Sequence, residues 1–509
     1  MVMLKLSGSN LSGHEVVQAI REGGPVEIDA AQLKEVVRSR ELVVRLLQEG
    51  LPVYGINTGF GKLAETSISG EKVADLQRNL ILSHSCGVGE PFSAEVVQAM
   101  IILRANALMK GYSGIRPEVI ELLVQLVNED VTPLIPSQGS VGASGDLVPL
   151  AHMSAVLIGE GRAYYRDQLY PAAEALQRAG LRPVTLEAKE GLALINGTQA
   201  MTAQGVLALY DGDVLLKTAD ITASLTMEAL AGIPSAFDGR VHSLRSHPGQ
   251  VAAAANLRKL LVGSDLVYGT EHERIQDAYS LRCIPQVHGA SKDAYRYVEG
   301  VLNTEINSVT DNPILFSQDG DVISAGNFHG QPVALALDFL GIALSEIGNI
   351  AERRIERLVN PQLSGLPPFL SEASGLNSGY MIIQYTAAAL VSENKVLSHP
   401  ASVDSIPTSA NQEDHVSMGS VAARKALRIL SNVQNIVAIE LLCACQGLEF
   451  RDRSKVAPAT RAVYDLVRKD VPPLKADRFL EPELKIARDL VVSGQVLKAA
   501  ENIVGSLVN

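Results

Sequence analysis

Apolar side chains recur at helical spacing along much of the second half of the chain. One stripe consists of Ile347, Ala351, Ile355 and Leu358, and a second consists of Leu430, Val433, Val437 and Leu441. The positions on the other face of the first stripe carry Glu352, Arg353, Glu356 and Arg357. A period of three to four residues predicts amphipathic helices that each bury one face.

The first half of the chain has a more broken pattern. Residues 196–230 are rich in Ala and Leu and predict another long helix, but glycine-rich turns interrupt the chain at 55–61, 87–89 and 139–145. Strand-like alternation is scarce, and no strand–helix–strand unit repeats. We therefore expect a mostly α fold, with a smaller mixed N-terminal region over residues 1–112 and a large helical body over 113–509.

Composition narrows the class of protein. Apolar residues make up 47% of the 509 residues and the formal net charge is −12, which argues against a general nucleic-acid surface. The four cysteines are Cys86, Cys283, Cys443 and Cys445. They are too few to staple a chain of this length and have no CxxC spacing, so we expect neither a disulfide framework nor a structural zinc site.

The hydropathy pattern gives no sign of a membrane segment or a secretory leader. No run reaches the roughly 18 uninterrupted apolar residues of a membrane helix, and Asp338 breaks the most apolar run, residues 333–344. The first ten residues lack an apolar stretch of the usual ~7–15 residues. We expect a soluble, cytoplasmic protein.

The most informative segment for chemistry is QGSVGASGDL at residues 138–147. Taken alone, it reads as the start of a helix, with Ser144 or Asp146 as the cap. The triplet Ala143-Ser144-Gly145 can also close on itself. In that reaction the Gly145 nitrogen attacks the Ala143 carbonyl and two waters leave. Loss of the Ser144 hydroxyl then creates an electrophilic 4-methylidene-imidazol-5-one without an external cofactor.

This segment is one of several that together resemble the aromatic amino acid ammonia-lyases and aminomutases. In chain order the segments are YGINTGFG at 54–61, LSHSCGVGEP at 82–91, GSVGASGDLVPLAHM at 139–153, LINGTQ at 194–199, QDAYSLRCIPQVHGA at 276–290, TDNP at 310–313, GNFHGQP at 326–332 and SANQEDHVSMG at 409–419. The resemblance covers nearly the whole chain. It implies the elongated helical bundle of the ammonia-lyase/fumarase-like fold and a homotetramer whose active sites draw on several subunits.

The resemblance also assigns roles in catalysis. It makes Tyr54 the base that removes the β-proton of the substrate, although a lone Tyr is usually a packed aromatic residue. A base with an ordinary pKa of about 10 would have to be shifted toward neutrality by an electropositive site. Arg282, otherwise an ordinary surface cation, becomes the clamp for the substrate carboxylate. Tyr279 and Gln276 precede it by three and six residues and are implied to lie near the electrophile and the carboxylate.

Two further residues receive roles from the same resemblance. Asn196, otherwise a turn or cap residue, would support the imidazolone oxygen or polar groups of the substrate. Phe328, otherwise a core aromatic, would pack against the substrate ring.

The substrate is indicated by Ser83, His84 and Glu413. Relatives that use phenylalanine usually carry an apolar pair at the first two positions and an uncharged amide at the third. A histidine and a carboxylate are costly beside a phenyl ring but can pair with the nitrogens of an imidazole. Tyrosine-using relatives often share the histidine, so Glu413 is the more discriminating residue and is also implied to be catalytic.

The expected reaction is therefore elimination of ammonia from L-histidine to give trans-urocanate, the first step of histidine degradation. Either the substrate amine or its imidazole ring could add to the electrophile. The alternatives are a tyrosine ammonia-lyase or aminomutase with the same electrophile, a fumarase-like lyase with a serine base, and a non-catalytic helical scaffold.

The remaining histidines do not suggest a metal site. His152, His288, His329, His399 and His415 show no HExxH or comparable spacing. We expect most of them to be structural, with His415 and its neighbour Asp414 in a supporting contact near the site. No metal, nucleic acid or membrane partner is expected.

Overall fold

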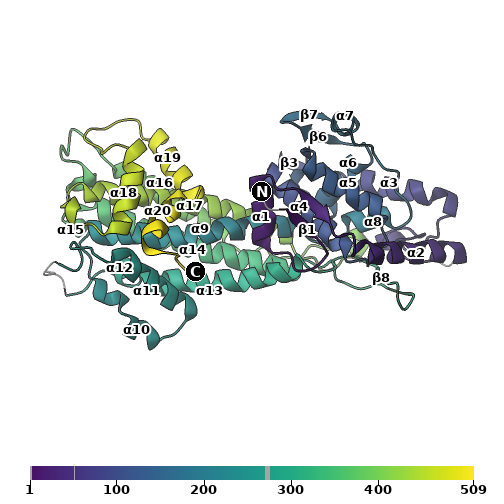
Figure 1. The fold of residues 1–509 in the computed structure, drawn as a ribbon, viewed down its shortest axis with the longest axis horizontal. Helices are drawn as coiled ribbons and strands as arrows, with labels where there is room; N and C mark the ends of the chain where they lie inside the picture. The colour runs from purple at the N-terminus through teal and green to yellow at the C-terminus, as the bar shows by residue number, and fades with distance from the viewer. Residues whose placement is uncertain (1–2, 51, 270–274) are drawn as a thin grey trace. The chain divides into compact units, whose positions relative to one another are not determined.

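A computed structural model describes residues 3–50, 52–269 and 275–509 of the chain. The described residues form twenty α-helices and nine short strands, so the expected mostly α fold is confirmed (Figure 1). The chain divides into two compact units. Unit 1 comprises Met1–Leu207, Glu299–Asp338 and Pro400–Arg424, and unit 2 comprises Ala208–Val298, Phe339–His399 and Lys425–Asn509. The boundary expected near residue 112 lies within unit 1.

Unit 1 contains the shorter N-terminal helices and all the strands. Its helices are α1 (Gly13–Glu22), α2 (Leu33–Glu49), α3 (Val73–His84), α4 (Ala94–Met109), α5 (Pro117–Asn128), α6 (Leu147–Leu157), α7 (Ala172–Arg178) and α8 (Glu190–Ile195). Its strands are β1 (Leu4–Leu6), β2 (Val26–Ile28), β3 (Val88–Pro91), β4 (Val131–Pro133), β5 (Pro136–Gln138), β6 (Arg162–Tyr165), β7 (Gln168–Pro171), β8 (Ile314–Phe316) and β9 (Asp321–Ile323).

The strands of unit 1 form small sheets rather than a central one. The pair β1–β2 is parallel, and β3–β5, β4–β6–β7 and β8–β9 are antiparallel. Figure 1 shows β6, β7 and α7 beside one another. Because these sheets are so short, the hydrophobic core of unit 1 is built mainly from helices such as α4, where thirteen of the sixteen residues are buried.

The described residues of unit 2 form helices joined by turns and loops, and none of them forms a strand. Its shorter helices are α10 (Gly239–Ser243), α11 (Pro248–Leu261), α12 (Tyr279–Arg282), α15 (Pro361–Ser364), α16 (Met381–Leu397), α18 (Pro458–Asp470), α19 (Glu481–Val492) and α20 (Gln495–Val504). Four division points between the units fall inside the long helices α9 (Gln199–Ala229), α13 (Ile284–Glu305), α14 (Gln331–Val359) and α17 (Gly419–Leu448).

The two apolar stripes seen in the sequence are buried faces of α14 and α17. Each of their eight residues is at most 3% exposed. The expectation that the charged residues of α14 all face away from the core is wrong at Glu352, which is only 3% exposed. Its carboxylate accepts a hydrogen bond from Gln384 Nε2 at 2.6 Å, and this contact offsets part of the cost of burial.

Helices α14 and α17 are also long and apolar enough to cross a membrane by length and composition alone. However, 72% and 78% of their most apolar windows are buried inside the protein. Burial of this extent is typical of core helices.

The interior of unit 2 holds buried charged groups that the apolar pattern does not reveal. Arg354 donates to both carboxylate oxygens of Glu440, and both side chains are fully buried. His288 Nδ1 lies 2.7 Å from Asp220 Oδ1, and Lys292 Nζ lies 3.0 Å from Asp220 Oδ2. Burial lowers the pKa of His288 below its usual value, which favours the neutral imidazole. The structural role expected for His288 fits this position.

Unit 1 contains a buried ion pair that joins two segments of its core. Lys189 immediately precedes α8, and its Nζ donates to Asp311 Oδ2 at 2.8 Å, with the two side chains 0% and 2% exposed. The residue after Asp311 is Asn312, and the alkyl stem of Lys189 packs near Gly55. This pair therefore connects α8, the 310–313 segment and the 54–55 loop.

Asp311→Asn should destabilise unit 1 by about 3–5 kcal/mol, because it leaves the buried Lys189 ammonium without its charge partner. Denaturant unfolding should show the midpoint moving to lower denaturant. Asp319→Asn, a change of the same kind at an exposed position, is the control and should leave the midpoint in place. Equal midpoints for both variants would contradict the structural role of the pair.

Candidate functional site

A pocket of about 1110 Å³ opens within unit 1 and gathers most of the residues singled out in the sequence. Eight residues with an expected role line it: Tyr54, Ser83, His84, Ala143, Ser144, Asn196, Phe328 and Glu413. They come from six separate stretches of the chain. Seven of the eight motifs that carry the family resemblance thus contribute to this pocket, and the motif at 276–290 does not.

The Ala143-Ser144-Gly145 triplet lies in the loop between β5 and α6, in a conformation that requires glycine. Gly145 has φ +71°, and its backbone lies against Gly197, with which it forms an isolated bridge. A Cβ atom at Gly145 would collide with the Gly197 carbonyl. Only a residue without a side chain fits here, and an unhindered Gly145 is also what ring closure would need.

Asp146 fixes the carboxyl-terminal side of this loop. Its carboxylate accepts hydrogen bonds from the Met201 N–H at 2.7 Å and the Ser420 hydroxyl at 2.5 Å, and its own N–H donates to Gly197 O at 2.7 Å. Burial raises the pKa of Asp146, while these hydrogen-bond donors lower it. The loop is thereby tied to the starts of α9 and α17.

Ser144 projects into the pocket and contacts two of the other site residues. Its hydroxyl donates to Glu413 Oε1 at 3.0 Å, and Asn196 Nδ2 donates to its carbonyl at 3.5 Å. The second polar atom of the Asn196 amide, Oδ1, is buried without a hydrogen-bond partner. Since such an atom is costly in isolation, Asn196 retains an unused acceptor beside Ser144.

Tyr54 lies on the loop that follows α2, with its hydroxyl inside the pocket. The Gly61 N–H donates to this hydroxyl at 3.4 Å. Burial raises the pKa of Tyr54 above its usual value of 10.0, the Gly61 hydrogen bond lowers it, and the carboxylates of Glu413 and Asp311 raise it. The net direction is upward, so the surroundings described here do not provide the electropositive site expected for a tyrosine base.

His84 is the last residue of α3 and continues a helix face that borders the pocket. Leu76 and Leu80 precede it at four-residue intervals and also line the pocket. Ser83 Oγ lies 3.0 Å from His84 Nδ1. Burial lowers the pKa of His84 below 6.5, against the opposing effects of the Leu80 carbonyl and Glu413. The imidazole is therefore predominantly neutral at pH 7.

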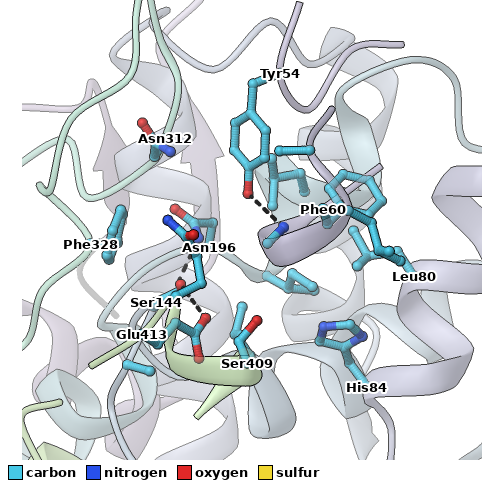
Figure 2. Close-up of a pocket in the computed structure, with 18 of the residues that line it drawn as sticks. Tyr54, Phe60, Leu80, His84, Ser144, Asn196, Asn312, Phe328, Ser409 and Glu413 are labelled. Carbon is cyan, nitrogen blue, oxygen red and sulfur yellow. Dashed lines mark hydrogen bonds between the residues drawn. The ribbon is translucent and has the colours of Figure 1, made fainter. Parts of the chain in front are cut away.

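Figure 2 shows how these groups face one another. The Tyr54 hydroxyl points into the pocket from above, while Ser144 and Glu413 lie below it and are joined by a hydrogen bond. Asn312 and Phe328 border one side of the pocket, and Leu80 and His84 border the other. The arrangement places a phenol, a serine hydroxyl, an imidazole and a carboxylate around one space.

Several lining residues received no role from the sequence. Asn312 belongs to the TDNP motif, and its Oδ1 accepts the Ala325 N–H at 2.8 Å. The four-residue spacing of Leu76 and Leu80 before His84 would have identified both as members of one helix face. Phe60, Ser409 and Gln412 lie inside two of the family motifs but had no expected role, and Ser324 lies in a loop without periodicity.

Three predicted residues lie elsewhere. Gln276, Tyr279 and Arg282 belong to unit 2 and do not line the pocket. Tyr279 begins the short helix α12 and is 71% exposed, and the Arg282 guanidinium lies 4.7 Å from the centre of its ring. Gln276 precedes this helix and is exposed.

The pocket consequently has an unbalanced set of charges. Among its lining residues, all within the described part of the chain, there are the carboxylates of Glu413 and Asp414 but no Lys or Arg. His329 and His415 also line it, with ring centroids 5.6 Å apart. In residues 3–50, 52–269 and 275–509, no cluster of three His, Cys, Asp or Glu side chains is arranged to hold a metal ion.

Comparison with known proteins agrees with this arrangement. Residues 11–469 match the family described as aromatic amino acid lyase. A histidine ammonia-lyase of Symbiobacterium thermophilum is 59% identical over 98% of this chain and 99% of its own length. The crystal structure of a histidine ammonia-lyase from Trypanosoma cruzi has a TM-score of 0.92 and 43% identity, covering 99% of this chain and 96% of that one. A tyrosine aminomutase from Streptomyces globisporus has a TM-score of 0.95 and 38% identity over both full chains. The chain belongs to the aromatic amino acid lyase family.

Proposed function

We propose that this enzyme is a carbon–nitrogen lyase that eliminates ammonia from L-histidine to form trans-urocanate. The observation that carries the proposal is the meeting of Ser144, Tyr54, His84 and Glu413 in one pocket. The names of the relatives are consistent with it, because the similar proteins include histidine ammonia-lyases at 52–59% identity.

The electrophile is proposed to form from Ala143, Ser144 and Gly145. The residues present fit a methylidene-imidazolone: Gly145 is held at a positive φ where a side chain would clash with Gly197, and Asn196 donates to the Ser144 carbonyl. This group would supply an electrophilic carbon that converts the substrate amine into a better leaving group. Asp146 would hold the loop in place through its contacts with Met201 and Ser420.

The substrate ring is proposed to lie between His84 and Glu413. A neutral imidazole offers one donor and one acceptor, which His84 and a carboxylate can match. Phe328 would contact the flat face of the ring. A phenyl ring would leave His84 and Glu413 without partners, so the pocket favours L-histidine over L-phenylalanine.

The carboxylate of the substrate is proposed to bind Arg282 of a neighbouring subunit, with Gln276 and Tyr279 near it. The pocket residues described within one chain include no cation, yet an amino-acid carboxylate needs one. Arg282 has a buried Nε without a hydrogen-bond partner, and it is accompanied by the exposed Tyr279. A homotetramer with shared active sites would bring these residues to the pocket.

Apolar side chains on the surface of unit 2 support assembly. They are Tyr297, Phe339, Ile342, Ile382, Tyr385 and Val396, each 40–70% exposed. Exposed apolar residues in such numbers along helices are typical of subunit interfaces. The four cysteines are all unpaired, which suits the reducing cytoplasm in which we propose the reaction takes place.

Tyr54 is proposed to remove the β-proton of L-histidine. Its hydroxyl is held by the Gly61 N–H and faces the space above Ser144. Fixed orientation of base, ring and carboxylate would provide much of the rate enhancement.

Ser144→Ala should fold normally but lose nearly all formation of urocanate, because the methylidene carbon comes from the Ser144 side chain. Urocanate absorbance measures the rate, and intact mass should show that the wild-type chain is lighter than its sequence by two waters. Ser69→Ala, at an exposed position, is the matched control and should keep full activity. Wild-type turnover by the Ser144→Ala variant would overturn the proposal.

The rate should rise with pH between about 7 and 9. Tyr54 acts as a base only when it is deprotonated, so the rate should grow by up to about tenfold per pH unit until the pH reaches the pKa of Tyr54, which the groups of one chain raise and Arg282 of a neighbouring subunit would lower. Glu413→Gln removes a negative charge that raises the pKa of Tyr54, so it should shift the profile toward lower pH. A kcat that is independent of pH in this interval, or an active Tyr54→Phe variant, would exclude Tyr54 as the base.

A further inference from the structure

Two backbone hydrogen bonds between Thr408 and Glu413 close the turn that leads to Glu413. The Thr408 N–H donates to Glu413 O at 2.9 Å, and the Glu413 N–H donates to Thr408 O at 3.3 Å. Between them Ser409, Ala410 and Asn411 all have positive φ values, of 50°, 52° and 66°. Three consecutive non-glycine residues in this region are rare, and such conformations persist only where the surroundings hold them.

The side chain of Thr408 also holds the carboxylate itself. Its hydroxyl donates to Glu413 Oε2 at 2.7 Å, while Ser144 donates to the other oxygen, Oε1, at 3.0 Å. Both side chains are half-buried. The two carboxylate oxygens therefore have different partners, one from the turn and one from the triplet.

This inference rests on the proposed function, in which the Ser144 hydroxyl is lost and the Thr408 hydroxyl is kept. Formation of the electrophile removes the Ser144 hydroxyl and releases Oε1. The bond from Thr408 to Oε2 does not depend on Ser144. After ring closure, the carboxylate would be anchored through Oε2 and would present Oε1 to a substrate.

The same turn contacts the segment that holds Tyr54. A Cβ atom on Gly61 would lie 2.9 Å from Ser409 Oγ, so Gly61 packs closely against the turn. The N–H of Gly61 donates to the Tyr54 hydroxyl. The position of the turn therefore affects where both the Glu413 carboxylate and the Tyr54 hydroxyl lie.

We propose that Thr408 is a positioning residue for the reaction: its hydroxyl anchors Glu413 Oε2 so that Oε1 is directed at the imidazole of the substrate. Thr408 makes no proposed contact with the substrate and acts through Glu413. A hydrogen bond to a charged acceptor is among the stronger ones, so its loss should be measurable in kinetics.

The test compares Thr408→Val and Thr408→Ser in the wild-type enzyme and in a Glu413→Gln background, with L-histidine as substrate. Thr408→Val, which removes the hydroxyl while keeping the shape, should lower kcat/KM about 10–100-fold. Thr408→Ser keeps the hydroxyl and should stay within about threefold of wild type. In the Glu413→Gln background, Thr408→Val should have an effect of less than about threefold, because the anchored carboxylate is already gone.

Two controls separate positioning from folding. Thr304→Val removes a hydroxyl that donates only to its own helix, and it should leave kcat/KM unchanged. Thr408→Ala removes the same hydroxyl without adding a buried methyl group and replaces Thr408→Val if the latter does not fold. Intact mass should show normal loss of two waters in each variant, since Thr408 is not part of the triplet.

The outcomes distinguish this inference from the proposed function. Equal losses in the wild-type and Glu413→Gln backgrounds, or no loss on removal of the hydroxyl from an active enzyme, would overturn the positioning role and leave the proposed function standing. A wild-type enzyme that does not convert L-histidine would overturn both. Coupling between positions 408 and 413, with rescue by serine, is the result expected.

Discussion

The arrangement of the site depends on the hydrogen bonds made by one buried residue, Asp146. It accepts hydrogen bonds from Met201 and Ser420, and the N–H of the same residue donates to Gly197. Segments more than 200 residues apart in the sequence meet at this one side chain. Because a buried carboxylate is stable only while its donors are in place, the conformation of Gly145 is maintained by the packing of α9 and α17 rather than by the loop alone.

The distribution of charge around the pocket bears directly on the assembly proposed above. Glu413 faces the space above Ser144, but no Lys or Arg among the described residues lines the pocket. A substrate that carries its own carboxylate would be repelled unless a cation were added. Under the proposed function Arg282 of another subunit supplies that cation, and it would also lower the pKa of Tyr54, which the groups of a single chain raise.

Much of the fold could be predicted from the sequence, because its signals are local. The stripes at Ile347 and Leu430 are periodic, and both are buried faces of long helices. Buried charged groups were harder to foresee. Helical spacing places Arg354 and Glu440 on the faces of the two stripes, but the local pattern does not show that the two charges pair, because the partners are 86 positions apart.

The same limit applies to the site. The motifs identify Ser144, Asn196 and Glu413, and the structure brings them together. They do not reveal Thr408, because the role proposed for it depends on a turn with positive φ values that the residue types do not predict. Nor can a single chain explain Arg282, which the motifs associate with the site but the fold places in unit 2. Contacts set by tertiary or quaternary structure leave no periodic trace in the sequence.

Selection of an imidazole ring by His84 and Glu413 can be tested by ultraviolet absorbance of the purified enzyme with L-histidine, L-tyrosine and L-phenylalanine in separate reactions. We expect a growing urocanate band with L-histidine and no unsaturated product with the other two amino acids. Product from L-tyrosine alone would contradict the role given to Glu413, and no product from any of the three would contradict the ammonia-lyase assignment itself.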